Sequence, residues 1–543
     1  ASAAGTSGMC GPSAYWSFDS STGTLTISGS GAMNDYEYGD YPWMDYRNSI
    51  QTIVIGDQIT QIGWNAFPWT ACSTIKFGKN VRSIGERAFN GCRNLNGDLT
   101  LPDSVQTIGA GAFQGCEKLS GDLTIPDSVQ TIGDSAFEFC TGLNGTLTLG
   151  KNLRTIGKKA FSGCAFTGSL TIPEGITEIA IGTFSSSRSS GMFTGKLTLP
   201  STLKTIGASA FSYTDFSGEL LIPDGVTSIG ASAFAKCDGF GGTLSLPDSV
   251  KTVGESAFYL CEGFTGLKLS VGLTKIERYS FAHMYGLKTK VVIPEGVTEI
   301  GESAFSCSYM PSVRLPSTLK KIEKQAFMYA HNLTKITLPD GLETIGDEAF
   351  SGCHPRNAVV LPASIKSIGK KAFDRDGAIY GNLNEIPVGA YFLGDAPQIV
   401  GTGNANCSFP SDWTLYYLPG TSGWTGDTYE GYQIAPWDGE TRWDNLRTSK
   451  FGYGWDNKGN EIETSWSVNT DTGKITLTDD LNEGCAVAVS YDAEGRVTSI
   501  GVLRTKTDSV RLNLQDTCRL FLLNASSAPR LNTPVTINDY LPT

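Results

Sequence analysis

A phenylalanine that recurs at nearly constant intervals restricts the fold of this sequence more than any other feature. Fourteen copies are separated by 22 to 27 residues, and alanine precedes twelve of them. The copies are Phe67, Phe89, Phe113, Phe137, Phe161, Phe184, Phe211, Phe234, Phe258, Phe281, Phe305, Phe327, Phe350 and Phe373. A period of this length is typical of a solenoid, in which each repeat forms one coil and stacks on the next.

A second fixed point lies eleven residues before each phenylalanine. Four coils have Gly56, Gly78, Gly150 or Ser270 there, and the other ten have proline. The prolines are Pro102, Pro126, Pro173, Pro200, Pro223, Pro247, Pro294, Pro316, Pro339 and Pro362. Since this distance never changes, the length variation falls on the other side of each coil. The longest insertion, residues 185–191, is expected to form a surface loop.

Each coil divides into a strand and a turn. Apolar and polar residues alternate just before the proline, as in residues 98–101 and 122–125, which predicts a strand with one buried face. Proline has no N–H for the ladder and ends the strand. The following Gly-x-x-Ala-Phe segment predicts a short helical turn that carries the phenylalanine into the core.

The complete unit, L-x-[LI]-P-x-x-[VL]-x-x-I-G-x-x-A-F-x-x-C, resembles the BspA-like, or Treponema-pallidum-type, leucine-rich repeat. The resemblance covers residues of about 50 to 375 in fourteen copies in register. Segments at residues 10–43 and 391–424 are similar to those that flank these repeats in secreted bacterial proteins. The resemblance implies extracellular display and binding to a host, microbial or matrix component, without indicating which one.

These patterns predict a leucine-rich-repeat solenoid of the α/β type, mostly β with short helical turns, followed by a small all-β sandwich. Residues 1–49 are expected to form a β-hairpin cap, 50–375 the solenoid of about 14 coils, and 376–438 a C-terminal cap. Residues 439–543 contain short alternating runs and a hairpin signal at 492–495, which favour an immunoglobulin-like sandwich.

Composition and motifs exclude several functions. The net charge of −12 argues against nucleic acid as a partner, because phosphates need a positive surface. There is no apolar run of eighteen residues, so no membrane-spanning helix is expected. Catalytic and metal-binding motifs are absent, and the sequence predicts a monomeric binding protein with no enzymatic activity, cofactor or metal.

Three smaller features have ordinary structural interpretations. His283 and His331 fall near phenylalanine positions and are interpreted as loop or edge residues. Residues 374–377 contain a fragment of a calcium-loop pattern without its later ligands, which favours a plain turn.

Seven cysteines stand three residues after a phenylalanine: Cys92, Cys116, Cys140, Cys164, Cys237, Cys261 and Cys353. Stacked positions form a buried column, so free thiols that act as small apolar fillers are favoured over a chain of disulfides. Cys485 and Cys518 form the better candidate for a disulfide. The disulfide states of Cys10, Cys407, Cys485 and Cys518 are left open.

The outward face of the predicted strands is the first candidate for ligand binding. Its outward positions begin with threonines, at Thr100, Thr124, Thr148, Thr171 and Thr198. Basic residues follow further along, at Lys268, Lys290, Arg314 and Lys335. Threonine also suits strands, and charges keep exposed strands soluble, so the same pattern has a purely structural interpretation.

Two terminal groups of aromatic residues form the second candidate. The first comprises Tyr36, Tyr38, Tyr41, Trp43 and Tyr46, and the second comprises Trp413, Tyr416, Tyr417, Trp424, Tyr429, Tyr432 and Trp437. Exposed rings could bind a glycan, whereas buried rings would cap the ends of the core, which is the favoured interpretation. The main prediction is a secreted or cell-surface bacterial protein that binds a protein or matrix ligand. The alternative is a carbohydrate-binding accessory protein.

Overall fold

A computed structural model describes the fold of two compact units, residues 1–382 with 388–435, and residues 383–387 with 436–543. The structure describes residues 6–37, 39–186, 192–333, 335–353, 358–374, 389–403 and 405–436, with only the backbone at 335 and 358. In the second unit it describes the backbone of the strands alone. The expected loop at 187–191 and residues 375–377 of the calcium-like fragment lie outside these ranges.

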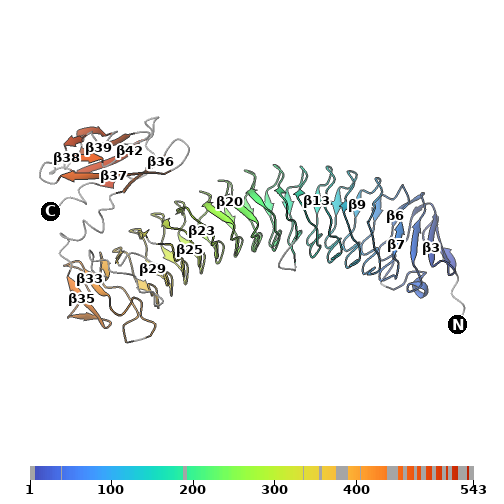
Figure 1. The fold of residues 1–543 in the computed structure, drawn as a ribbon, viewed down its shortest axis with the longest axis horizontal. Helices are drawn as coiled ribbons and strands as arrows, with labels where there is room; N and C mark the ends of the chain where they lie inside the picture. The colour runs from blue at the N-terminus through green and yellow to red at the C-terminus, as the bar shows by residue number, and fades with distance from the viewer. Residues whose placement is uncertain are drawn as a thin grey trace. The chain divides into compact units, whose positions relative to one another are not determined.

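The first unit is a β-solenoid, whose coils follow one another in a single row (Figure 1). Each coil is named here by its phenylalanine. Before the proline position, most coils contribute one strand to a parallel ladder, which we call the first ladder. Its strands are β5 (Thr52–Ile55), β7 (Thr74–Lys76), β10 (Leu123–Thr124), β12 (Leu147–Thr148), β14 (Leu170–Thr171), β16 (Leu197–Thr198), β18 (Gly218–Leu221), β20 (Phe240–Ser245), β22 (Phe264–Lys268), β24 (Val291–Val292), β26 (Ser312–Arg314), β28 (Lys335–Ile336) and β30 (Ala358–Leu361).

A second parallel ladder follows the proline, where the sequence predicted inward apolar groups but no strand. Its two-residue strands place one side chain outward and one into the core. They are β6 (Ile59–Ile62, which is longer), β8 (Ser83–Ile84), β9 (Thr107–Ile108), β11 (Thr131–Ile132), β13 (Thr155–Ile156), β15 (Glu178–Ile179), β17 (Thr205–Ile206), β19 (Ser228–Ile229), β21 (Thr252–Val253), β23 (Lys275–Ile276), β25 (Glu299–Ile300), β27 (Lys321–Ile322), β29 (Thr344–Ile345) and β31 (Ser367–Ile368).

The Gly-x-x-Ala-Phe segment is not helical, so the prediction of a helical turn is wrong. In the Phe137 coil, Ser135 and Phe139 have φ values of 56° and 60°, and these left-handed residues interrupt any helix. The N–H groups of Ser135, Phe137 and Phe139 instead donate to carbonyls of the next coil, each at 2.8 Å. Among the described residues, the one helix is the 3-10 turn η1 (Met44–Tyr46).

The phenylalanines form one continuous buried column. Neighbouring rings in the fourteen coils lie 5.2 to 5.7 Å apart and are nearly parallel, as for Phe137 and Phe161 at 5.4 Å and 2°. Trp43 stacks on Phe67 at 5.2 Å, and Phe409 stacks on Phe373 at 5.3 Å. The coil pattern therefore continues by one ring at each end, in segments that lack the Ala-Phe signature.

The cysteine column consists of free thiols with a defined hydrogen bond. All described cysteines are free. Each of the seven thiols three residues after a phenylalanine donates to the phenylalanine carbonyl of the preceding coil, over 2.9 to 3.2 Å. In the Phe305 coil, Ser308 takes this place and donates to the Phe281 carbonyl at 2.7 Å. The position therefore selects a small hydrogen-bond donor and not merely an apolar filler.

Extra strands cover both ends of the solenoid. At the N-terminus, β1 (Ser7–Met9), β2 (Ala14–Asp19) and β3 (Thr24–Gly29) pair antiparallel in sequence, and β3 then pairs parallel with β5. β4 (Gly31–Ala32) adds to the second ladder. At the other end, β32 (Gly389–Phe392) and β33 (Thr414–Tyr417) continue the first ladder from β30. β34 (Thr428–Tyr429) and β35 (Tyr432–Pro436) form a hairpin beside them.

The second unit contains two antiparallel sheets of four strands, in the orders β36-β37-β38-β41 and β40-β39-β42-β43. The strands are β36 (Phe451–Trp455), β37 (Glu461–Asn469), β38 (Lys474–Leu477), β39 (Cys485–Tyr491), β40 (Val497–Leu503), β41 (Ser509–Arg511), β42 (Thr517–Leu523) and β43 (Val535–Thr536).

The register of β39 and β42 contradicts the predicted disulfide between Cys485 and Cys518. Cys485 is opposite Leu523, and Cys518 is opposite Ser490. The two cysteines are therefore displaced by five positions along the strands, which is about 16 Å. A disulfide needs Cα atoms within about 7 Å, so this pairing is wrong.

Candidate binding surfaces

The predicted strand face exists as a ladder of outward side chains. Thr100, Thr124, Thr148, Thr171 and Thr198 are all exposed. Thr124 lies opposite Thr148, and Thr171 lies opposite Thr198, in adjacent coils. The structure therefore brings together four of the threonines that the sequence identified as candidate ligand-binding residues, whereas the coil of Thr100 has no strand in the first ladder.

The same ladder continues toward the basic residues. Leu221, Ser245, Lys268, Val292 and Arg314 follow one another in register, one from each coil, and we call them the outward column. Lys268 is exposed and Arg314 is half-buried. Leu221 has 71% of its surface exposed, an unusual place for a large apolar side chain, and the sequence gave no reason to select it.

The other two predicted basic residues lie beside this column. Lys290 is half-buried and precedes β24, and the backbone of Lys335 lies in β28 opposite Ser312. The side chain of Lys335 lies outside the described residues. The predicted basic end therefore contains one exposed cation, Lys268, among the described side chains of this group.

The two lysines in the strands of the second ladder, Lys275 and Lys321, differ because they are paired. Lys275 lies 3.3 Å from carboxylate oxygens of both Glu277 and Glu299. Lys321 forms an ion pair with Glu323. Within the described part of the chain, no ion pair involves Lys268, so its charge is available on the first ladder.

A second surface, which we call the turn face, comprises the residues from two before to four after each phenylalanine. In twelve coils the residue two positions after it has a left-handed backbone, and four of these coils have glycine there: Gly91, Gly115, Gly163 and Gly352. His283 and Tyr329 occupy the same position with φ values of 61° and 57°. A side chain in this conformation costs about 1–2 kcal/mol, and six other coils also carry one: Trp69, Phe139, Tyr213, Lys236, Leu260 and Cys307.

The turn face of the Phe258 to Phe327 coils carries a group of aromatic residues that we call the ring cluster. Its members are Tyr259, Tyr279, His283, Tyr285, Tyr309, Tyr329 and His331. Successive ring centroids lie 5.3 to 6.1 Å apart, in mostly edge-to-face contacts. Such contacts fix the orientation of each ring before any ligand arrives.

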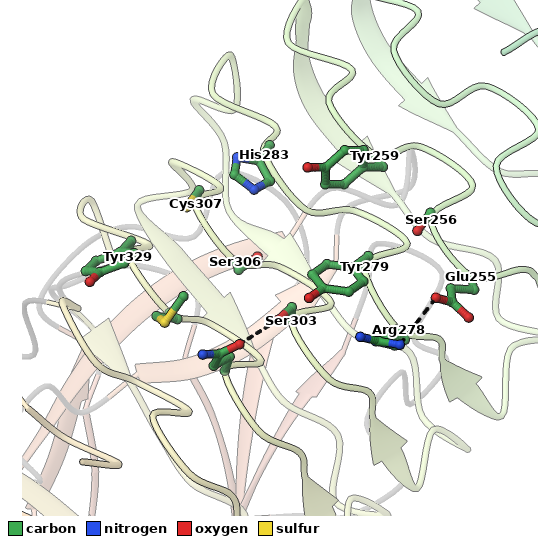
Figure 2. A pocket seen from close by; sticks show the side chains of 12 residues that line it. Glu255, Ser256, Tyr259, Arg278, Tyr279, His283, Ser303, Ser306, Cys307 and Tyr329 are labelled. Atoms are coloured by element: carbon green, nitrogen blue, oxygen red, sulfur yellow. Dashed lines mark hydrogen bonds and ion pairs between the residues drawn. The ribbon is translucent and has the colours of Figure 1, made fainter. Parts of the chain in front are cut away.

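A hollow of about 610 Å³ opens beside the ring cluster and is called here the turn-face hollow. Figure 2 shows Tyr259 and His283 together on one side, with Tyr279 between Tyr259 and Arg278. Ser256, Ser303, Ser306, Cys307, Gln325 and Met328 complete much of the lining. The volume is within the range of ligand sites, about 300–1,000 Å³.

Ion pairs hold the charged groups of the hollow in place. Arg278 Nε lies 3.3 Å from Glu302 Oε2, and Arg278 Nη1 lies 3.7 Å from Glu255 Oε1. The guanidinium also lies over the Tyr279 ring, 4.8 Å from its centroid. One cation therefore serves two carboxylates, and this side of the hollow carries no excess positive charge.

Burial keeps the nearby titratable rings neutral. It lowers the pKa of His283 below its usual value, so the imidazole is uncharged at neutral pH. Its Nδ1 lies 2.5 Å from the Tyr285 hydroxyl oxygen. Burial likewise raises the pKa of Tyr285, so this hydroxyl remains protonated and the pair can exchange donor and acceptor roles.

Comparison with known families agrees with the solenoid. The family model for the BspA type leucine rich repeat region matches residues 44–140, 121–241, 240–354 and 320–385. Together these matches cover more than half of the chain. The chain belongs to the BspA-type leucine-rich repeat family. A comparison with curated protein sequences finds no match.

Solved structures of other leucine-rich repeat proteins are similar to this chain. One from Bacteroides ovatus is 26% identical over 65% of this chain and 94% of that chain, with a TM-score of 0.51. One from Eubacterium ventriosum is 22% identical over 64% and 96%, with a TM-score of 0.39. A leucine rich cell surface protein from Faecalibacterium prausnitzii is 26% identical over 61% and 94%, with a TM-score of 0.38. BspA-type proteins as a group fit an interaction or adhesion role at the bacterial surface.

The terminal aromatic residues of this BspA-type chain mainly form core. Tyr41 and Trp43 are at most 4% exposed, and Trp413, Trp424 and Tyr432 are at most 8% exposed. Tyr36, Tyr46, Tyr417 and Tyr429 pack against them as half-buried rings, and Tyr416 stacks on Tyr391. Tyr38 and Trp437 lie outside the described residues. These rings therefore cap the solenoid, and few ring faces are available for a glycan.

Sequence reasoning missed the turn-face hollow. His283 and His331 do lie in turns, but they belong to a ring cluster that the separate interpretation of each histidine did not predict. Alignment of the coils on their phenylalanines would have shown rings in three successive coils, with Tyr285, Tyr309 and His331 each four residues after a phenylalanine. Within the described ranges, no group of three or more His, Cys, Asp or Glu residues is arranged to hold a metal, and no helix could span a membrane.

Proposed function

We propose that this chain is a cell-surface interaction protein of a bacterium, which acts by binding and not by catalysis, and that its solenoid binds a protein or matrix component. The observation that carries this proposal is the outward column on the first ladder. It places an exposed apolar side chain, Leu221, and an exposed cation, Lys268, on a regular sheet with a hydroxyl between them. Binding surfaces combine apolar anchors with charged groups in this way.

The choice of the first ladder over the second rests on charge. Lysines of the second ladder already have carboxylate partners, whereas Lys268 is available to an acidic group on a ligand. Electrostatic complementarity of this kind raises association rates and selects the partner. The proposed ligand therefore has an acidic patch next to an apolar one.

The second unit is proposed to be a small β-sandwich that acts as a spacer or as a second docking module. Two antiparallel four-stranded sheets support this, because they are the usual components of such a fold. The proposal also includes a monomeric protein, with the N-terminal strands as one cap of the solenoid and residues 376–438 as the other.

Surface plasmon resonance tests the proposed function. The full chain is passed over immobilised collagen, laminin and elastin, and any binding is remeasured with Lys268→Glu and Leu221→Thr. Lys251→Glu is the matched control, because Lys251 is exposed beside β21 of the second ladder. We expect both first-ladder variants to weaken binding about tenfold and the control to bind normally. Equal binding by all variants would contradict the role of this face.

A further inference from the structure

The turn-face hollow lies on a different surface from the outward column, and its chemistry points to a different ligand. It is lined by rings from neighbouring coils. The rings of Tyr259 and His283, for example, are in contact although the two residues are more than 20 positions apart in the sequence. The coils bring these rings together only because the solenoid stacks them in register. Rings also occupy the position of His283 in the Phe67, Phe137 and Phe211 coils, as Trp69, Phe139 and Tyr213, but none of these lines the hollow.

The packing of the solenoid does not require these rings. Glycine occupies the position of His283 and Tyr329 in four other coils, and the buried column of phenylalanines continues past those glycines without interruption. Six other coils also carry a left-handed side chain there, so the conformation by itself does not mark a site. What sets these coils apart is the contact between rings of neighbouring coils, which glycine at this position would not provide.

The lining combines flat apolar rings with many neutral hydrogen-bonding groups. Ser256, Ser303 and Ser306 contribute hydroxyls, and Gln325 contributes an amide whose oxygen accepts from the Ser303 hydroxyl at 3.3 Å. Aliphatic surface is limited mainly to Met328. A ligand that matches this lining has an apolar face to stack on a ring and hydroxyls around its edge.

The fixed charges narrow the class of ligand further. Arg278 is shared between Glu255 and Glu302, so a phosphate, sulfate or carboxylate group would meet more negative than positive charge. The ion pairs still offer N–H donors from the guanidinium and acceptor oxygens from the carboxylates in a rigid arrangement. Neutral hydroxyl groups can use both.

We infer that the turn-face hollow binds a neutral oligosaccharide, with one sugar ring stacked on the ring cluster and its hydroxyls bound by the serines, Gln325 and the Arg278–Glu255 pair. A proline-rich peptide is the main competitor, because such peptides also dock against aromatic side chains. Their grooves are largely apolar, whereas this lining offers a hydrogen-bonding group beside nearly every ring. The polar lining therefore favours the sugar.

The test uses the full chain on an array of neutral gluco-, manno-, galacto- and xylo-oligosaccharides, followed by isothermal titration calorimetry with the strongest binder. The double variant His283→Gly/Tyr329→Gly removes two rings and inserts the residue that four coils already have at this position. Tyr213→Gly is the matched control, because Tyr213 is a half-exposed ring at the same position of the Phe211 coil and does not line the hollow. Circular dichroism checks that each variant is folded.

The expected result is binding by the wild type, a loss of roughly tenfold or more in the double variant, and a change of less than about twofold in the control, since ring stacking makes a large contribution. Lys268→Glu should leave this binding unchanged, which separates the inference from the proposed function. Three results would overturn it: no binding by the wild type at millimolar sugar, equal binding by the double variant, or binding of a proline-rich peptide in the hollow in place of a sugar.

Discussion

Replacement of Cys140 distinguishes a hydrogen-bond donor from an apolar filler. Cys140 is fully buried, and its thiol donates to the Phe113 carbonyl at 3.1 Å. That carbonyl also accepts from the Cys116 N–H at 3.2 Å, so it keeps one partner when the thiol is removed. The loss in Cys140→Ala is then one hydrogen bond, about 0.5–1.5 kcal/mol, and the packing of one sulfur atom, about 1 kcal/mol.

Serine at this position should cost less than alanine, because its hydroxyl can donate to the same carbonyl. We expect Cys140→Ala to lower the free energy of unfolding by about 1.5–2.5 kcal/mol and Cys140→Ser by less than about 1 kcal/mol. If the position accepted only apolar fillers, a buried hydroxyl would be the worse choice, and the order would reverse. The sign of the difference in unfolding free energy between Cys140→Ser and Cys140→Ala therefore distinguishes the two roles.

Urea unfolding followed by far-UV circular dichroism under reducing conditions measures this difference. The urea concentrations at the midpoint of unfolding are compared only between variants whose transitions have the same slope, because a stacked repeat protein need not unfold in one step. The reciprocal exchange Ser308→Cys serves as the control and should be nearly neutral, since the structure already uses both donors in this role. A Cys140→Ser variant that is less stable than Cys140→Ala would refute the reasoning.

Three further predictions concern the core, the turn face and pH. Phe137→Ala should lower the free energy of unfolding, measured with urea, by about 3–5 kcal/mol. Phe137→Leu should lower it less, because leucine fills most of the cavity but loses ring stacking on both sides. Gly91→Ala should destabilise the chain more than Gly97→Ala does, and it should change the fluorescence of Trp69. Both glycines have positive φ, but only at Gly91 would an added Cβ meet the Trp69 ring, at 2.7 Å. Burial raises the pKa of Cys353 to about 12, above its unfolded value, so its contribution to stability should be present below about pH 9 and be lost as the pH rises toward 12. Urea midpoints measured at about pH 8 and pH 10 should therefore fall less in Cys353→Ser than in the wild type; an equal fall in both would contradict this assignment.

The part of each coil between the proline position and the phenylalanine was predictable, because its constant length allows only one register between neighbouring coils. With eleven residues between the proline position and the phenylalanine, Thr124 must lie opposite Thr148, as the structure has it. The turn was predicted incorrectly, because Gly-x-x-Ala-Phe carries ordinary helix-compatible residues. Its left-handed positions, such as Ser135, arise from hydrogen bonds to the next coil, and these have no local sequence signal.

Of the two candidate sites, the strand face was predictable from the sequence and the turn-face hollow was not. The threonines of the strand face could be found within single coils, since alternation alone places them outward. The turn-face hollow depends on contacts between coils, such as the ring of Tyr285 with that of Tyr309, and no single repeat contains it. Trp43 and Phe409 extend the ring column, although neither belongs to the Ala-Phe pattern, because tertiary stacking and not a motif places them there.

Hydrogen–deuterium exchange with and without the bound matrix protein tests most directly whether the chain is an interaction protein that uses its first ladder. We predict added protection in peptides that contain β18, β20, β22, β24 and β26, which carry the outward column, and little change in the second-ladder strands β19, β21, β23, β25 and β27. Protection confined to the second ladder or to the second unit would contradict the proposed function.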